Sequence, residues 1–406
     1  MTPSSEKPEP PRRAVLRSAP FRRLFAARTA SRWGDTFNTI AIVILVYRIS
    51  GSGVSVAATV IFEIVPVLAF GFVAGAVVDR MPRIAIMVSA DLARAAIAGT
   101  LAVFGHHLGV VYAAAFAMSA FTVFFNPAAT SVLPAIAGAD LLDANSMIWS
   151  TAVVSQIALA PLAGVLVASA GAGPAFAINA VSFLVSAALL TRIRLPHRVP
   201  TRRRYLADIA DGFAYLRTSR FLVTLAAVQG LAALSAGATS ALLVVLAERN
   251  LHLGAGRFGV LLAAIGIGAG AGPLLLRRLT RKVSRPALLF GPYLLRGLVD
   301  LSLAAFDSFA GALVGLAAYG VGTSTGNVTY HTILQSVVPD ERRGRVFAFY
   351  DVVWQTGRLA SIGVGGVLAD ALGIAAVYYL GGGLLLVAGI VGFTHLRARD
   401  LGLVEL

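Results

Sequence analysis

The chain has 406 residues, of which 57% are hydrophobic and only 13% charged, and its formal net charge is +15. So large an apolar fraction excludes an ordinary soluble globular protein, which needs more polar surface. The absence of cysteine excludes disulfides, thiolate metal sites and cysteine nucleophiles. Apolar runs of 18 or more residues are typical of membrane spans, and about a dozen occur here, so we expect a polytopic membrane protein.

The first 20 residues are polar, proline-rich and basic, and they lack the apolar core of a cleavable signal peptide. We therefore expect residues 1–20 to form a tail, with the first span directing insertion. The spans must be helices, because isolated strands would leave backbone groups unsatisfied in hydrocarbon. The sequence predicts twelve of them, at roughly 24–48, 54–78, 84–105, 109–131, 145–170, 174–192, 221–247, 257–277, 286–305, 309–337, 346–371 and 374–396.

The distribution of Lys and Arg predicts the orientation of these spans. The tail and the loops that follow even-numbered spans contain 26 basic residues, whereas the opposite loops contain three, namely Arg48, Arg249 and Arg257. Both termini are therefore expected to be cytoplasmic. On this reading the positive charge faces anionic lipid headgroups, and no nucleic acid is expected as a partner.

A long polar break at 193–220 divides the chain near its middle. Leu206, Ile209, Phe213 and Leu216 recur there at helical spacing, which indicates an amphipathic linker helix or a plain connector. At an offset of 202 residues, basic residues of the two halves coincide, as do Gly171 and Gly373. We therefore predict two parallel six-helix halves, 21–192 and 221–397, followed by a cytoplasmic tail over 398–406.

The loop after the second span contains GAVVDRMPR (75–83). It resembles the motif G-x-x-x-D-R-x-G-R of the major facilitator superfamily, with Pro82 in place of the second glycine. Other stretches resemble that superfamily's bacterial drug and siderophore exporters, namely SRWGDTFNTIAIVILVY (31–47), NPAATSVLP (126–134) and LQSVVPDERRGRVFAF (334–349). The segment APLAGV (160–165) is similar to the antiporter motif G-P-x-x-G-G, but Ala160 replaces its first glycine.

The resemblance implies a cytoplasmic latch between the halves. An anion is disfavoured at the C-terminal end of a helix, so Asp79 needs a partner there. Gly75 allows a neighbouring helix to approach, and the resemblance implies that this neighbour is the eleventh span, which begins near Arg345. Arg80 and Arg83 would hold the loop at the headgroups. The alternative is that these charges only fix the topology.

Ionisable groups inside spans cost roughly 2.5–3.5 kcal/mol at the centre on insertion scales, so each one suggests a function. In the first span, helical spacing places on one face Arg28, Arg32, Asp35, Asn38 and Thr39. The resemblance implies that the first, fourth, seventh and tenth spans line a substrate cavity. This stripe should then face the cavity, together with Asn126, Gln229, Asn327 and His331; the alternative is a structural Arg32–Asp35 pair.

Two carboxylates are candidates for proton coupling. Asp35 lies near the middle of the first span, where desolvation and the neighbouring Arg32 act on its proton affinity in opposite directions. Glu63, in the second span, is the rival, and Arg358 in the eleventh lies at a similar depth and could pair with it across the two halves. The pairs Asp91–Arg94 and Arg296–Asp300 are expected to neutralise each other within peripheral spans, the third and ninth.

No enzyme motif and no Walker loop occurs in the sequence, and no cofactor or metal is expected. The sequence therefore favours a monomeric secondary transporter of the cytoplasmic membrane, with lipids, protons and a small molecule as partners. The resemblance implies export of small, largely apolar, drug- or siderophore-like compounds by alternating access and proton antiport. The alternatives are an importer of the same fold, a non-transporting scaffold or sensor, and a lipid enzyme.

Overall fold

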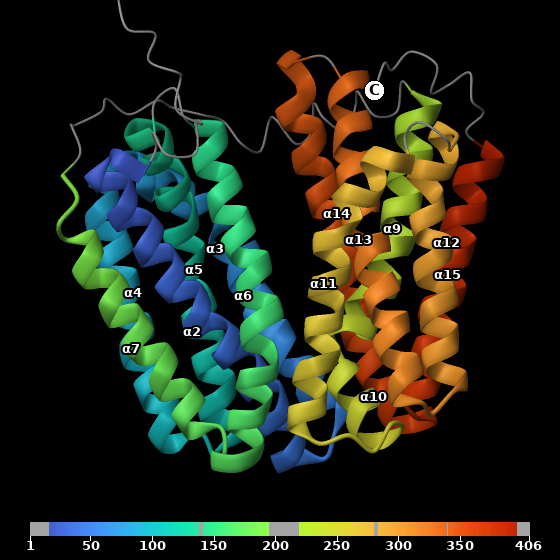
Figure 1. The fold of residues 1–406 in the computed structure, drawn as a ribbon, viewed down its shortest axis with the longest axis horizontal. Coiled ribbons are helices and arrows are strands. Elements are labelled where there is room, and N and C mark those ends of the chain that lie inside the picture. The colour runs from blue at the N-terminus through green and yellow to red at the C-terminus, as the bar shows by residue number, and fades with distance from the viewer. Residues whose placement is uncertain (1–15, 138–140, 195–218, 280–282, 339, 396–406) are drawn as a thin grey trace, which may run out of the picture. The chain divides into compact units, whose positions relative to one another are not determined.

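The computed structural model describes residues 16–137, 141–194, 219–279, 283–338 and 340–395 (Figure 1). The linker helix predicted at 206–216 and both chain ends lie outside these residues. The described part is helical, with thirteen helices: α2 (Ala19–Ser50), α3 (Gly53–Arg80), α4 (Arg83–Phe104), α5 (Leu108–Ala137), α6 (Leu141–Ala170), α7 (Gly173–Leu190), α9 (Arg220–Ala241), α10 (Leu243–Arg249), α11 (Ala255–Leu279), α12 (Arg285–Ala305), α13 (Phe309–Val337), α14 (Asp340–Leu372) and α15 (Ile374–His395).

Eleven of the twelve predicted spans each coincide with one helix, and most of the ends agree within a few residues. Within the described ranges, eight helices are long and apolar enough to cross a membrane: α3, α4, α5, α7, α9, α11, α12 and α15. The all-helical membrane fold is thus confirmed. The count of twelve crossings and the orientation of the termini remain predictions.

The span predicted at 221–247 is wrong as a single helix, because it breaks at Leu242 between α9 and α10. Two contacts explain the break. The Thr239 carbonyl accepts a hydrogen bond of 2.7 Å from the Tyr378 hydroxyl, and the Ser240 hydroxyl bonds back to the Ala236 carbonyl. Hydroxyl groups that bond to carbonyls of the preceding turn compete with the helical ladder and bend helices.

The predicted repeat is visible in the helix boundaries. Shifting α3 by 202 residues gives 255–282, against Ala255–Leu279 for α11, and shifting α4 gives 285–306, against Arg285–Ala305 for α12. Gly171 and Gly373, also 202 apart, follow α6 and α14 with φ angles of 80° and 86°. Glycine adopts this left-handed conformation without steric cost and commonly ends helices.

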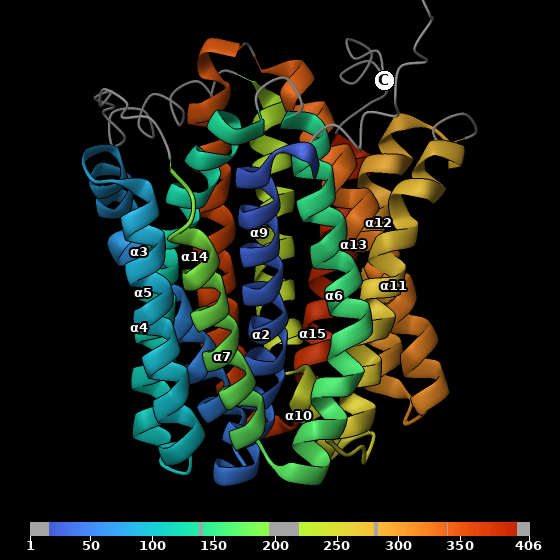
Figure 2. The ribbon, with the colours of Figure 1, turned by 60° about the vertical axis from the view of Figure 1, so that its left-hand side comes forward.

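The described chain divides into two compact units, and the division does not follow the sequence halves. Unit 1 contains Met1–Thr39, Val65–Ser155 and Ala172–Thr201, and unit 2 contains Ile40–Ile64, Gln156–Gly171 and Arg202–Leu406. Parts of α2, α3 and α6 therefore belong to unit 2. In unit 1, α4 contacts α5 and α7, and in unit 2 the corresponding α12 contacts α13 and α15 (Figure 2).

Small residues allow helices of unit 2 to approach closely. A Cβ atom on Gly268 of α11 would lie 1.9 Å from the Ala317 carbonyl oxygen of α13, and one on Gly320 would lie 2.1 Å from the Ile265 carbonyl oxygen. The run GIGAGAG (266–272) is therefore a helix-packing face. Each unit also has its own apolar core, around Phe21, Met87 and Leu133 in unit 1 and around Leu225, Leu289 and Leu334 in unit 2.

Candidate functional site

Unit 1 contains a charged pocket of about 200 Å³ among four helices. Its walls come from α2, α4, α5 and α6, and they combine four ionisable side chains with hydroxyl, amide and apolar groups: Phe25, Arg28, Thr29, Ser31, Arg32, Asp35, Arg94, Thr122, Phe125, Asn126, Ile148 and Thr151. Arg28, Arg32 and Asp35 share one face of α2 because their spacing follows the helical repeat. The pocket thus brings together four residues of the predicted cavity and coupling set: Arg32, Asp35, Asn126 and the stripe residue Arg28.

Arg94 is the residue of this pocket that sequence reasoning missed. It forms the predicted intrahelical ion pair with Asp91, and both side chains are buried. The same guanidinium group donates a 3.4 Å hydrogen bond to the Thr122 hydroxyl and lies 4.5 and 4.3 Å from the ring centres of Phe125 and Phe183. Arg94 therefore neutralises Asp91 and also faces the pocket, although α4 was expected to be peripheral.

The charges of this pocket act on Asp35. Arg94 and Arg32 both lie near enough to attract its carboxylate. Among side chains that the structure describes, neither Arg28 nor Arg32 forms an ion pair, so the pocket carries an excess of positive charge. A carboxylate held among arginines inside apolar helices can gain or lose a proton when the hydration of the pocket changes.

Unit 2 contains a larger pocket, of about 500 Å³, between α9, α13 and α14. It brings together the predicted cavity residues Gln229, Asn327 and His331. The remaining walls are mainly aromatic, with a single carboxylate: Tyr330, Phe347, Tyr350, Asp351 and Trp354. A pocket of this size and lining is typical of sites for drug-sized ligands.

The other predicted site residues lie apart from both pockets. Asn38 is buried in α2, and its Oδ1 atom has no hydrogen-bond partner within the described part of the chain. Glu63 attracts the guanidinium group of Arg358, so these two charges are neighbours within unit 2. On α12, Arg296 and Asp300 lie near enough to attract each other, and Arg296 also donates a 2.8 Å hydrogen bond to the Tyr319 hydroxyl.

Of the predicted latch residues, only Arg80 and Arg83 have described side chains. Arg80 is exposed at the end of α3. Arg83 donates a 3.2 Å hydrogen bond to the Ser131 carbonyl of α5, which ties the start of α4 to that helix. The side chains of Asp79 and Arg345 and the surroundings of Gly75 lie outside the described part of the structure.

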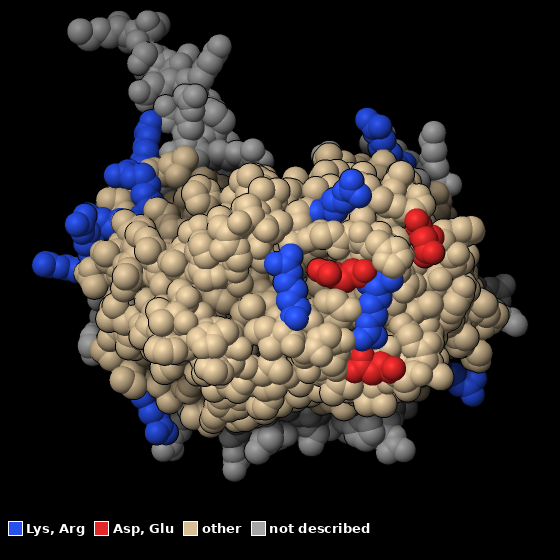
Figure 3. Space-filling model, turned by 90° about the horizontal axis from the view of Figure 1, so that it is seen from below, with Lys and Arg blue, Asp and Glu red and all other residues tan. Residues whose placement is uncertain are grey.

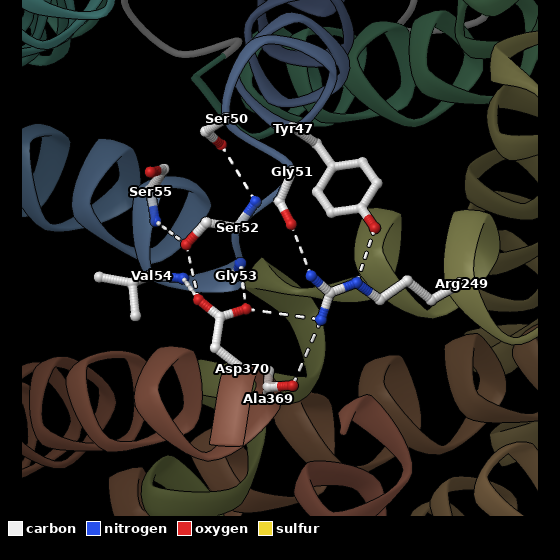
Figure 4. A network of polar contacts seen from close by, with 10 residues as sticks. All are labelled: Tyr47, Ser50, Gly51, Ser52, Gly53, Val54, Ser55, Arg249, Ala369 and Asp370. Carbon is white, nitrogen blue, oxygen red and sulfur yellow. Dashed lines mark hydrogen bonds and ion pairs between the residues drawn. The ribbon is translucent and has the colours of Figure 1, made fainter. Parts of the chain in front are cut away.

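A polar network missed by the sequence analysis joins the α2–α3 turn to α10 and α14 within unit 2 (Figure 4). Asp370, in the last turn of α14, accepts hydrogen bonds from the Ser52 hydroxyl at 2.6 Å and from the backbone amides of Gly53 and Val54 at 2.8 and 3.1 Å. The carboxylate thereby satisfies amides at the first turn of α3, where an anion is favoured.

Arg249, the last residue of α10, completes this network. Its guanidinium group donates to the Tyr47 hydroxyl at 2.9 Å and to the carbonyls of Gly51 at 2.5 Å and Ala369 at 3.4 Å, and it lies 3.5 Å from Asp370. Figure 3 views the molecule from this end, where a few basic and acidic side chains lie near one another on a mostly uncharged surface. The network fastens two segments that the sequence assigns to different halves.

Comparison with known proteins identifies the family. The model of the transmembrane secretion effector family matches residues 12–401. The chain belongs to this family, within the major facilitator superfamily. It is therefore a multi-pass transporter of the cytoplasmic membrane and not an enzyme.

Several relatives have assigned names. The chain is 27% identical over 403 residues to "Multidrug efflux pump Tap" of Mycolicibacterium fortuitum, covering 94% of this chain and 97% of the relative. It is 25% identical over 404 residues to "Uncharacterized MFS-type transporter YfiS" of Bacillus subtilis, covering 91% of each. Identity to "Enterobactin exporter EntS" of Citrobacter koseri is 27% over 266 residues, which is 63% of this chain and 61% of that protein.

Solved structures of the superfamily share the fold. A bacterial homologue of the iron transporter ferroportin, in an inward-facing state, has a TM-score of 0.77 at 18% identity, covering 94% of this chain and 98% of that one. The transporter PepTSo of the POT family has a TM-score of 0.76 at 14% identity, covering 96% and 99%. At these identities the likeness concerns the fold alone.

Proposed function

We propose that this transporter exports small, largely apolar compounds from the cytoplasm by alternating access and exchanges them for protons. The observation that carries the proposal is the charged pocket of unit 1, in which Asp35 lies among arginines within otherwise apolar helices. A scaffold does not require such a pocket, and burying these charges is costly. The efflux and exporter names of two relatives support outward transport over import.

In this proposal, Asp35 is the coupling carboxylate. Coupling requires a proton affinity that differs between the two access states. Opening the pocket to water would weaken the attraction of Arg32 and Arg94 for the anion, and it would also reduce the desolvation of the carboxylate, so its proton affinity changes between states. Glu63, close to Arg358, is the rival proton carrier. One proton moving down about 100 mV and one pH unit supplies roughly 3.7 kcal/mol, enough for a concentration ratio of several hundred.

The proposed cycle needs contacts that form and break at each side of the membrane. On the predicted topology, the network of Arg249 and Asp370 lies on the outer side and holds the two sequence halves together there. The proposed latch of Gly75, Asp79 and Arg345 would act on the cytoplasmic side. Outward opening requires the outer contacts to separate, while inward opening requires the inner ones to do so.

The pocket of unit 2 is proposed to hold the apolar body of the substrate. Its aromatic walls and its volume of about 500 Å³ suit a drug-sized compound, whereas the 200 Å³ pocket of unit 1 suits a small polar group and water. Drug-like or siderophore-like compounds are therefore the proposed substrates. We propose that the monomer, with two six-helix halves at 21–192 and 221–397, is the transporting form.

A vesicle assay tests the proposal. The purified protein is reconstituted into liposomes loaded with a pH-sensitive dye, and candidate compounds are added with and without an imposed pH gradient. We expect compound uptake against its gradient with matching proton movement in the opposite direction. Uptake that does not depend on the pH gradient would contradict proton antiport. Cells expressing the protein should also accumulate less of the same compound than control cells, whereas an importer would raise its accumulation.

A further inference from the structure

The pocket of unit 2 is lined by aromatic rings, two carboxamide side chains and one carboxylate. Phe347, Tyr350 and Trp354 come from α14, and Tyr330 and His331 come from α13. Asp351 is the acidic residue among the lining side chains, and no Lys or Arg is present among those that the structure describes around the pocket. The pocket therefore has the opposite charge character to the arginine-rich pocket of unit 1.

The spacing along α14 places the carboxylate between two rings. Phe347, Asp351 and Trp354 are four and three residues apart, so they share one face of the helix. A ligand seated on that face would meet an apolar ring on each side of the negative charge. Asp351 forms no hydrogen bond or ion pair within the described part of the chain, and its side chain is exposed to the pocket.

Contacts between aromatic rings of α13 and α14 hold the lining of the pocket in place. The ring of His331 is stacked on that of Phe347 with centroids 5.5 Å apart and planes 7° apart, and Tyr330 meets Tyr350 edge-on at 5.7 Å. The Tyr350 hydroxyl donates a 2.7 Å hydrogen bond to the Leu222 carbonyl of α9. A binding surface whose rings are fixed in advance loses little conformational freedom when a ligand binds.

Polar groups of the pocket also limit what it can bind. The Oε1 atom of Gln229 already accepts a 2.8 Å hydrogen bond from the Tyr293 hydroxyl. On the same face of α14 as Asp351, the next charged residue is Arg358, ~10 Å further along the helix axis, and its charge faces Glu63. The carboxylate of Asp351 is thus the charged group that remains available to a ligand among those lining the pocket.

We infer that the pocket of unit 2 binds an organic cation with aromatic groups, and that Asp351 selects the charge. A cation attracts both a carboxylate and the faces of aromatic rings, and an anion is repelled by both. This inference rests on the proposed function and narrows its substrates, from largely apolar compounds to apolar compounds with a positive charge. It also makes Asp351 a specificity-determining residue, which the sequence motifs did not indicate.

A pair of ions of nearly identical shape and opposite charge tests the inference. Tetraphenylphosphonium and tetraphenylborate both present four phenyl rings, so the difference between their affinities isolates the sign of the charge. Binding is measured by calorimetry on the full chain in lipid nanodiscs, after subtraction of binding to empty nanodiscs. We expect the phosphonium to bind at least tenfold more tightly than the borate.

Variants then test the role of Asp351. Asp351→Asn keeps the size of the side chain and removes its charge, so we expect about tenfold weaker phosphonium binding, equivalent to about 1.4 kcal/mol. Asp351→Glu should stay within about threefold of the original affinity. Asp307→Asn is the matched control, because it removes the same charge from an exposed loop. Equal affinity for the two ions, or unchanged phosphonium binding in Asp351→Asn, would overturn the inference.

The binding assay also separates this inference from the proposed function. Phosphonium binding without transport of any compound would leave the inference standing and contradict the proposed function. Export of neutral or anionic compounds without phosphonium binding would support the proposed function and contradict the inference. The comparison of the two ions needs no substitution, so it decides the matter even if Asp351→Asn does not fold.

Discussion

We expect Asp370→Asn to favour the state that is open on the outer side. The carboxylate of Asp370 accepts three hydrogen bonds from the start of α3 and pairs with Arg249. In the substituted side chain an amide NH₂ group replaces one oxygen and faces donors, so the contacts of that oxygen are lost. The charge that favours the first turn of α3 and attracts Arg249 is lost as well.

The magnitude of this effect follows from the number and exposure of the contacts. Hydrogen bonds to charged groups contribute roughly 1.5–3 kcal/mol, and an anion at a helix N-terminus about 0.3–1 kcal/mol. The side chains of Asp370 and Arg249 are 29% and 36% exposed, so water screens part of this energy. We therefore expect a net loss of about 1–2 kcal/mol, which would shift the equilibrium between access states roughly five- to thirtyfold.

A single cysteine reports the opening, since the chain has no cysteine of its own. Ala57 of α3 is 2% exposed, and a Cβ atom on Gly366 of α14 would lie 2.7 Å from its side chain. Ala57→Cys therefore lies within the contact that must separate. We expect an impermeant thiol reagent, added outside whole cells, to label this cysteine about tenfold faster in the Asp370→Asn background.

Two outcomes would refute this reasoning. If labelling of the Ala57→Cys protein stays within twofold when Asp370→Asn is added, the network does not hold the outer contact closed. If Asp307→Asn raises the labelling rate as much, the effect arises from surface charge alone. Arg249→Lys provides a graded test, because lysine keeps the charge but cannot reproduce the four directed contacts of the guanidinium group.

Three further predictions concern the topology, the inner latch and the proton. Cysteines replacing His106 and Arg203 should be labelled by an impermeant reagent in whole cells at 106 but not at 203, and the reverse pattern would invert the topology. Asp79→Asn should lower transport severalfold with expression largely kept, and normal transport would reduce Asp79 to a topology marker. Asp35→Asn should abolish gradient-driven accumulation while keeping some substrate binding, whereas Asp35→Glu should keep partial activity. If the Asp35→Asn protein shows full pH-dependent transport, Glu63 becomes the coupling residue, and Glu63→Gln is tested in parallel for this reason.

Most helices were predictable because they coincide with apolar runs, and eight of the described helices are apolar enough to cross a membrane. The break at Leu242 was not predictable, because the hydroxyl that donates a hydrogen bond to the Thr239 carbonyl belongs to Tyr378, 139 residues further along the chain. A local window contains no signal for such a contact. The paired glycines at 171 and 373 were predictable as a repeat, and their left-handed conformation explains why glycine stands at both positions.

Several residues of the site were predictable from their spacing, but the way the helices bring them together was not. The helical stripe of Arg28, Arg32 and Asp35 could be derived from spacing alone, and the three residues do line one pocket. Arg94 was assigned to a peripheral helix, and its place in that pocket depends on how α4 packs against α5. The cost of an arginine inside an apolar span was a signal that it had a second role.

The network of Arg249 and Asp370 shows a different limit of sequence reasoning. Arg249 entered the prediction only as a charge that sets topology, and Asp370 lies in an unremarkable apolar context. The segment Ser50–Gly53 ends one helix and begins another, so its free amides require an acceptor. Sequence can state that requirement, but the identity of the acceptor depends on the tertiary structure that brings residue 370 to the turn.

The repeat gives both halves similar helices, yet equivalent positions have taken on different roles. Arg94 and Arg296 are 202 residues apart on α4 and α12. Arg94 reaches a pocket that contains Asp35, whereas Arg296 is buried and bonds to the Tyr319 hydroxyl. The pocket of unit 2 instead combines aromatic rings with Asp351. On the proposed function, proton exchange would involve α2 and α4, and ligand recognition would involve α13 and α14. Substitutions in the two pockets should therefore change proton coupling and substrate affinity independently.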